Sequence, residues 1–523
     1  MKKSSLLTLF IICLIQICLG FMFGTEKTNY HIDEIFTFGL ANNTSGITMT
    51  LPEGELLDRS MLNQYVTVDS SHRFDYSNVW ANQTTDVHPP FYYTLIHTIS
   101  SFFPDKFVIM GGIGLNILCS VIITILIFFI TIELVQNEIL SLSLSAVWAV
   151  SLANMTFIVF MRMYMMLALF IIAITLLHIR YISQKLTFQF YLGVVLLSIA
   201  GTLTQYYFLI YLFFLCFIFS ISLLINKYFK HALYYLLSLG IAGIGAIFIF
   251  PGMLHHIFSG YRGKESFSNI MKTSNTLVRI KGYYKIINKE LFNQLLPVLL
   301  IILAIIFFIF LFTNRNMLNW KHIVFSKYNL LLFPSLFYFI VVSKISVSIT
   351  DRYMMPIFPV LLIIVISALT YLSSRVISKN YIILAEACFF VFISALGLVQ
   401  NRNITYLYKE TAPLVQFAKE NKDSDVLVVY DSPWQLNYVY EELAQYEHIR
   451  VMSQFDLFKF KDIIDSYNDS IVYVVSFSYN STMDDLMSMN HSWESYTLEN
   501  ETHDFFCLKL KSNHLSNETS IKP

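Results

Sequence analysis

Long apolar stretches recur through the first 400 residues and limit what this chain can fold into. A helix that crosses a bilayer needs about 20 mostly apolar residues, and about eleven stretches meet that requirement. They lie near residues 5–23, 108–132, 138–157, 160–179, 188–205, 206–225, 232–250, 292–312, 328–345, 354–373 and 381–399. Only 13% of the residues are charged, against roughly 25% in soluble domains. We therefore predict a polytopic α-helical membrane protein.

The short loops between these stretches indicate an orientation. Lysines and arginines such as Lys2, Arg180, Lys230 and Arg375 fall on one side, which the positive-inside rule assigns to the cytoplasm. Since no small-x-small cleavage site follows the first stretch, we expect an uncleaved signal anchor with a cytoplasmic N-terminus in the plasma (inner) membrane. An odd number of spans then places loop 24–107, loop 251–291 and the C-terminal tail outside the cytoplasm.

The composition changes near residue 403. Residues 425–430 and 470–475 form short apolar runs that are typical of buried strands, and helical patterns lie near 434–446, 458–467 and 482–489. We therefore expect a transmembrane module over 1–402 and a small extracytoplasmic α/β domain over 403–523. The α/β domain has no Gly-rich phosphate loop, so it is expected to be a lid or a module that docks the acceptor rather than a nucleotide site.

Two polar clusters lie at the ends of loop 24–107. Asp33 and Glu34 follow the first apolar stretch, and Asp86 and His88 precede the helix-initiating pair Pro89-Pro90. Neighbouring residues on a helix point about 100° apart, so one acid of the pair is suited to act as a base while the other orients a neighbour. For Asp33 the alternative is a solvated acid at the headgroup level. Residues 91–103 are expected to form an interfacial helix or the start of a tilted span.

Cationic and aromatic side chains recur at the predicted outer ends of two later spans. Arg162 and Tyr164 lie between the third and fourth spans, and Arg352 and Tyr353 open the tenth. Arginine can bind a phosphate through two parallel hydrogen bonds. The alternatives are snorkelling of Arg162 to headgroups and a structural bridge between Asp351 and Arg352. The basic loop 251–291 is expected to lie on anionic headgroups or to help gather a lipid phosphate.

This ordered set of motifs resembles the GT-C class of integral membrane glycosyltransferases. The likeness is strongest to the bacterial dolichyl-phosphate-mannose-protein mannosyltransferase-like group, with its lipopolysaccharide-core-transferase-like and aminoarabinose lipid A transferase-like branches. It rests on the segments 31–36, 86–93, 162–164 and 351–356. The resemblance implies inverting transfer of a sugar from a polyprenyl-phosphate donor to an acceptor hydroxyl outside the cytoplasm. The family's loop-one catalytic acid corresponds to Asp33, and its neighbour to Glu34.

The resulting hypothesis is one shared active site. Its catalytic group would comprise Asp33 as the base with Glu34, Asp86 and His88, while Arg352, Arg162, Tyr353 and Tyr164 would bind the donor phosphate. No metal-ligand spacing requires an ion, although His88 and the acids could hold a divalent cation. The acceptor would be a cell-envelope glycan, lipid or protein, and the equal numbers of basic and acidic residues, 35 each, give no reason to expect nucleic acid. Competing hypotheses are a transporter or flippase of lipid-linked sugars and a membrane-anchored binding protein that acts through its C-terminal domain.

Overall fold

The chain forms two compact units, and both are assembled from segments that are far apart in the sequence. The computed structural model describes residues 2–182, 184–272, 275–313, 327–376, 381–467, 470–477, 479–490, 493–501 and 506–512. Unit 1 comprises Met1–Glu26, Gln83–Leu95 and Ile109–Tyr406, and unit 2 comprises Lys27–Asn82, Ile96–Val108 and Leu407–Pro523. Residues 513–523 of the predicted C-terminal domain lie outside the described residues.

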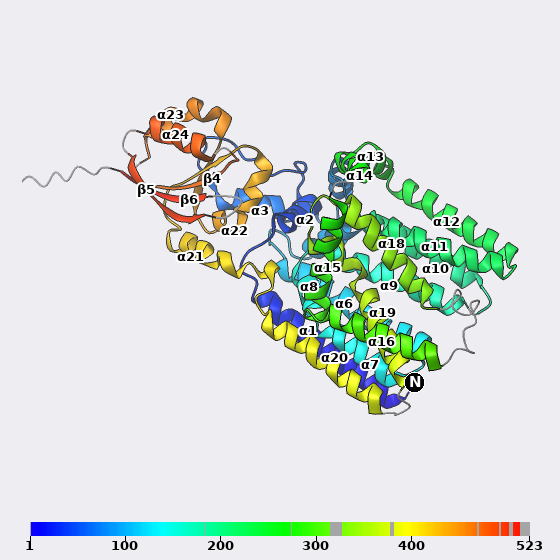
Figure 1. Cartoon of the computed structure of the whole chain (residues 1–523). Helices are drawn as coiled ribbons and strands as arrows, with labels where there is room; N and C mark the ends of the chain where they lie inside the picture. The colour runs from blue at the N-terminus through cyan, green and yellow to red at the C-terminus, as the bar shows by residue number, and fades with distance from the viewer. Residues whose placement is uncertain are drawn as a thin grey trace, which may run out of the picture. The chain divides into compact units, whose positions relative to one another are not determined.

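Unit 1 is a bundle of helices, most of them apolar (Figure 1). Its helices are α1 (Lys3–Thr25), α6 (Ile109–Val135), α7 (Glu138–Ala149), α8 (Leu152–Val159), α9 (Tyr164–Tyr181), α10 (Phe188–Thr204), α11 (Tyr207–Ile225), α12 (Phe229–Ile249), α13 (Gly252–Phe258), α14 (Tyr261–Met271), α15 (Thr276–Phe292), α16 (Leu296–Thr313), α18 (Asn329–Ile345), α19 (Phe358–Val376) and α20 (Tyr381–Gln400). Two 3-10 turns, η3 (Asp351–Tyr353) and η4 (Met355–Ile357), precede α19.

The helices confirm a multi-pass membrane protein. Among the described residues, seven helices are long and apolar enough to cross a membrane, and two bent pairs raise the number to nine. The pair α7 and α8 bends by 49°, and the pair α15 and α16 bends by 86°. Two shorter apolar helices, α10 and α18, coincide with the remaining predicted stretches. Each predicted span thus falls on an apolar helix or a bent pair.

Buried polar side chains join the helices of this bundle. Gln16 of α1 and Asn154 of α8 both bond Ser120 of α6, and Thr124 of α6 donates to Gln16 at 2.7 Å. Hydrogen bonds between helices replace the water that an apolar surrounding lacks. These interior polar groups are therefore accounted for by helix packing.

Unit 2 is an α/β unit whose six described strands form one sheet in the order β1-β3-β2-β4-β6-β5. The strands are β1 (Leu57–Asp58), β2 (Val426–Tyr430), β3 (His448–Ser453), β4 (Ser470–Val475), β5 (Trp493–Glu501) and β6 (Phe506–Ser512). The central strands β3, β2 and β4 are parallel, and β1, β6 and β5 add antiparallel edges. Every residue of β2 and β4 is buried, which confirms the two strands predicted from their apolar runs.

The helices of unit 2 come from both the loop and the tail. They are α2 (Ile32–Asn42), α3 (Arg59–Val66), α21 (Ala412–Glu420), α22 (Tyr440–Leu443), α23 (Lys461–Asp465) and α24 (Tyr479–Met489). Figure 1 shows α23 and α24 against the sheet, where Ile464, Leu486 and Val472 share one buried cluster.

Loop 24–107 is divided between the two units. Strand β1 of this loop pairs with β3 of the tail, so the unit that holds the C-terminal sheet also holds α2. This grouping differs from a simple boundary at residue 402. The boundary between the units falls within α4 (Ser77–Thr85) and again within α5 (Phe91–Ser101), and α5 begins directly after Pro90 as predicted. Its position at a membrane interface stays a prediction.

Candidate active site

The first turn of α2 presents Asp33. The ring Nδ1 of His31 caps the helix by accepting a hydrogen bond from the Asp33 backbone N–H at 3.0 Å. The carboxylate of Glu34 accepts from the His31 backbone N–H at 2.7 Å, which completes a reciprocal capping box. The Asp33 carboxylate lies 3.7 Å from the same ring nitrogen and its side chain is 26% exposed. Asp33 is thus accessible on a helix start of fixed geometry.

Glu34 lies in a different environment from its neighbour. Its carboxylate bonds the Lys27 ammonium at 2.9 Å, and the two side chains are 0% and 1% exposed. Burial lowers the pKa of Lys27, and the opposing attraction of Glu34 recovers part of that shift. Glu34 is enclosed and bonded to both Lys27 and the His31 amide, so its carboxylate supports the turn that carries Asp33.

Asp86, His88 and Arg162 form one network in unit 1. The carboxylate of Asp86 lies 2.7 Å from His88 Nδ1, and His88 Nε2 lies 3.4 Å from the Arg162 guanidinium. Since arginine can only donate, Nε2 must accept, and the hydrogen on Nδ1 is donated to the Asp86 carboxylate. The guanidinium, 3% exposed, also donates to the Tyr93 hydroxyl at 3.1 Å. The network thus fixes the orientation of a buried cation.

The pKa of the Asp86 carboxyl reflects two opposing effects. Burial raises the pKa, whereas the hydrogen bond and electrostatic attraction of His88, together with the positive charge of Arg162, lower it by more, so the net shift is downward. The group is therefore a carboxylate at neutral pH. It balances the positive charge of Arg162 next to it.

His256, which no sequence motif indicated, lies near this network. Its ring bonds the Tyr206 hydroxyl at 2.9 Å and the carbonyl of Thr84 at 3.3 Å. Burial lowers the pKa of His256, and Asp86 partly opposes that shift through its negative charge. The only local signal was a histidine pair within the basic loop 251–291. Its partner residues lie 50 and 172 positions away, so spacing alone could not identify it.

The segment Asp351–Tyr353 forms the short turn η3 before α19. Asp351 accepts a hydrogen bond from the Tyr406 hydroxyl at 2.6 Å and from the Arg352 backbone N–H at 2.7 Å. Burial raises the pKa of Asp351, and these two bonds and the Arg352 charge oppose the shift. The Arg352 guanidinium lies 5.3 Å from the centre of the Tyr353 ring. Asp351 therefore anchors the turn that carries Arg352.

An aromatic cluster joins the two arginine-bearing segments of unit 1. The rings of Tyr164 and Tyr353 meet edge to face at 6.5 Å, and Tyr207 meets Tyr353 at 5.6 Å. Phe160 stacks on both Tyr164 and Tyr406, and Tyr406 is the residue that bonds Asp351. The residues around 162 and 352 thus share one packed region. All the predicted donor-binding residues therefore belong to unit 1, together with Asp86 and His88.

Asp33 and Glu34 belong to unit 2, whereas the other predicted site residues belong to unit 1. The shared site that joins the two groups therefore stays a prediction. Within the described residues, no group of three or more histidines, cysteines or acids is arranged to hold a metal ion.

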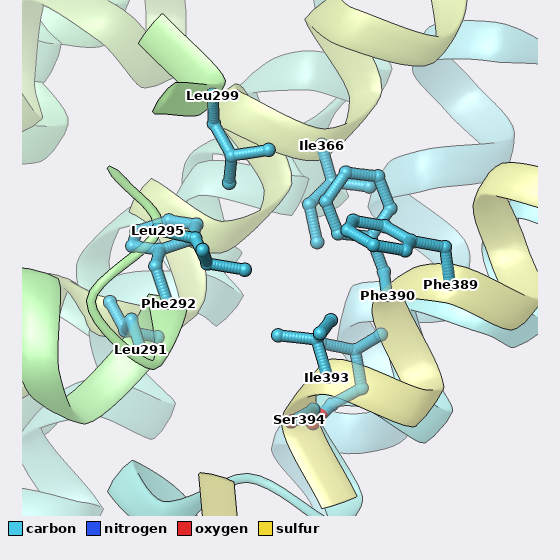
Figure 2. A pocket seen from close by; sticks show the side chains of 10 residues that line it. Leu291, Phe292, Leu295, Leu299, Ile366, Phe389, Phe390, Ile393 and Ser394 are labelled. Carbon is cyan, nitrogen blue, oxygen red and sulfur yellow. Dashed lines mark hydrogen bonds between the residues drawn. The ribbon is translucent and has the colours of Figure 1, made fainter. Parts of the chain in front are cut away.

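Unit 1 also contains an apolar pocket, whose lining shares no residue with these polar networks. Leu291, Phe292, Leu299, Ile366 and Phe390 are among its lining residues, as Figure 2 shows, and Ser394 is the polar one among the ten. It lies at the bend between α15 and α16. A wall without ionisable side chains offers no acid or base, so this pocket is a packing feature of the bundle.

Comparison with solved structures identifies the fold. The chain superposes on ArnT from Cupriavidus metallidurans bound to undecaprenyl phosphate with a TM-score of 0.56 and 9% sequence identity, over 97% of this chain and 98% of that chain. The apo state of ArnT gives a TM-score of 0.49 at 10% identity, over 91% and 96% of the two chains. The oligosaccharyltransferase AglB from Archaeoglobus fulgidus, in complex with an inhibitory peptide and a dolichol-phosphate, gives 0.49 at 11% identity, over 99% and 75%.

Sequence comparisons find neither a matching protein-family model nor a matching curated protein. The fold is nevertheless that of the GT-C membrane glycosyltransferases, and the resemblance stated from the sequence motifs is confirmed at the level of the fold.

Proposed function

We propose that this protein is a membrane glycosyltransferase that moves a sugar from a polyprenyl-phosphate donor to the hydroxyl of an extracytoplasmic acceptor. The observation that carries the proposal is the fold shared with ArnT over 97% of this chain, because that structure holds undecaprenyl phosphate. The partly exposed Asp33 carboxylate of unit 2 and the Asp86–His88–Arg162 network of unit 1 support it, each within its own unit.

Asp33 is proposed as the general base. An acceptor hydroxyl is a weak nucleophile, and a positioned carboxylate that takes its proton contributes about 10²–10⁴ in rate. As the acceptor oxygen forms its bond to the anomeric carbon, the bond from that carbon to the phosphate oxygen breaks and the proton passes to Asp33. Attack opposite the departing phosphate inverts the anomeric carbon. Asp33 suits this role because its carboxylate is partly exposed, whereas that of Glu34 is enclosed.

Arg352 and Arg162 are proposed to stabilise the departing lipid phosphate. Negative charge grows on that phosphate during the reaction, and fixed cations in a partly dry site stabilise it better than mobile ones in water. Arg162 is held by Tyr93 and His88, and His88 is held in turn by Asp86. Tyr164 and Tyr353 would complete the wall of the donor site.

The competing hypotheses predict different behaviour. A transporter or flippase needs polar groups along a path through the bundle, but Gln16, Ser120 and Asn154 are engaged in helix packing. A binding protein that acts through its tail predicts that Asp33 is dispensable. The roles of Asp33 and Arg352 therefore discriminate between the three hypotheses.

The test uses purified full-length protein in liposomes with radiolabelled polyprenyl-phosphate sugars, and it measures the loss of label from the donor and the affinity for undecaprenyl phosphate. Asp33→Asn is expected to lower turnover by at least about 10²-fold with unchanged affinity. Arg352→Ala is expected to weaken undecaprenyl phosphate binding by about tenfold or more, because it loses charge-assisted hydrogen bonds.

Matched controls are Asp69→Asn, an acid of the same loop that is 62% exposed, and Arg402→Ala, an arginine that is 63% exposed and paired with Glu26. Both are expected to retain turnover and affinity. Full turnover in Asp33→Asn would exclude it as the base, and the absence of any transfer or hydrolysis by the wild type across the donors would exclude a transferase.

A further inference from the structure

The turn that leads into α2 is held by residues of the C-terminal tail. The backbone N–H of Thr28 donates to the carbonyl of Leu407 at 2.9 Å, and its hydroxyl donates to the carbonyls of Leu407 and Tyr408 at 3.0 and 2.7 Å. The Lys27 ammonium lies 5.6 Å from the centre of the Tyr408 ring. The stretch before Asp33 thus belongs to the α/β unit, although almost 400 residues separate it in sequence from the tail residues that it contacts.

A buried hydrogen bond links this turn to α22. The side-chain amide of Asn29 donates to the Glu442 carboxyl oxygen Oε1 at 2.8 Å and to the Thr411 hydroxyl at 3.1 Å. Asn29 is 5% exposed and Glu442 is 0% exposed. Burial raises the pKa of Glu442 to about 8, so the group is largely protonated at neutral pH. A neutral buried carboxyl can accept this amide without leaving an unpaired charge.

The bond reaches Asp33 through a short chain of contacts. The side-chain oxygen of Asn29 accepts from the Tyr30 backbone N–H at 2.7 Å, and His31 follows as the cap that bonds the Asp33 amide. The amide plane of Asn29 is therefore fixed at both ends, by Glu442 on one side and by the backbone before α2 on the other. Loss of Glu442 therefore removes one of the two points that fix the Asn29 amide, while the bonds of Thr28 remain.

Aromatic side chains provide a second, parallel link. The ring of Phe107 meets Tyr30 at 5.4 Å and Tyr440 at 5.7 Å, both edge to face. Tyr440 begins α22, the same turn of helix that carries Glu442. The aromatic contacts hold the ring of Tyr30, whereas Glu442 holds the side-chain amide of Asn29, so the polar link can be removed without removing the packing.

We propose that Glu442 is a positioning residue for sugar transfer, which sets the place of Asp33 through its hydrogen bond to Asn29. The inference rests on the proposed function, and it gives the C-terminal α/β unit a role: to hold the turn that carries the general base. Misplacement of a catalytic group by about 1 Å can lower turnover by about 10²-fold.

The test compares four variants of the full chain: Glu442→Leu, Glu442→Gln, Asn29→Ala and Asn490→Leu. The last variant is the matched control. Asn490 is a buried amide of the same unit, and it donates to the carbonyls of Ile464 and Tyr467, neither of which bonds the turn before α2. Turnover, the affinity for undecaprenyl phosphate and hydrogen exchange of the first α2 amides are measured for each.

Glu442→Leu and Asn29→Ala are expected to lower turnover by about 10- to 100-fold, with undecaprenyl phosphate affinity within about twofold of wild type and faster exchange at the start of α2. Glu442→Gln keeps an acceptor for Asn29 and is expected to retain turnover. Equal losses in Asn490→Leu, or unchanged exchange in Glu442→Leu, would overturn the proposal. Failure of the wild type to transfer sugar would instead contradict the proposed function, and the exchange measurement would still test the link.

Discussion

Substitutions of the buried pair Lys27 and Glu34 test whether Glu34 has a supporting role and Asp33 a catalytic one. Glu34→Gln removes the carboxylate beside the buried Lys27 ammonium, and Lys27→Met removes the ammonium beside the buried Glu34 carboxylate. Breaking one side of a buried ion pair typically costs about 3–5 kcal/mol. Both side chains are at most 1% exposed and their N–O distance is 2.9 Å, so the full range applies.

The double variant Lys27→Met with Glu34→Gln removes both charges and keeps an acceptor for the His31 amide. A neutral replacement of a buried pair is often tolerated, so the double variant is expected to be more stable than either single one. Hydrogen exchange of the α2 amides gives the local opening free energy. A loss of about 3–5 kcal/mol corresponds to an increase of roughly two to four powers of ten in opening.

Sugar transfer by the same variants separates support from catalysis. If Glu34 only supports the turn, the double variant recovers most of the turnover that Glu34→Gln loses. If its carboxylate acts on the substrate, turnover stays low in the double variant although the helix is stable again. If the loss of stability in the double variant equals the sum of the losses in the two single variants, Lys27 and Glu34 do not stabilise each other.

Three further outcomes follow from the same structure. Burial raises the pKa of Glu442 to about 8 and of Glu441 to about 7, above the ordinary value of 4.5. Between pH 4.5 and 8 the folded protein therefore binds more protons than the unfolded chain. The free energy of unfolding should fall as the pH rises through this range. Urea unfolding at pH 5 and pH 8 checks this, and an equal pH dependence in Glu442→Gln would contradict it. Arg162→Lys keeps the charge but loses the planar fork that engages Tyr93, so undecaprenyl phosphate affinity should fall about tenfold by titration; unchanged affinity would remove Arg162 from the donor site. Arg279→Ala removes donors to the last turn of α18 and should speed amide exchange there, whereas exchange in α9 should not change.

The sequence alone determined the transmembrane architecture, because span length and apolar composition are local quantities that the bilayer imposes. It also placed Asp86 two residues from His88 and selected Arg162, and the structure brings these three together. Strands β2 and β4 were predictable because continuous apolar runs are typical of strands buried on both faces. The edge strands β5 and β6 mix polar and apolar residues, and β1 is only two residues long, so no local pattern indicated them.

Only the tertiary structure decided how the acids differ. Asp33 and Glu34 are neighbours with similar chemistry, and their exposure is set by what packs against each. Lys27 precedes α2, so no helical spacing linked it to Glu34, and Asn29 finds its partner Glu442 across 413 residues. These long-range bonds lie in the unit in which strand β1 of the loop pairs with β3 of the tail. The sequence thus selected the acidic pair, and packing buried Glu34 against Lys27 and left Asp33 partly exposed.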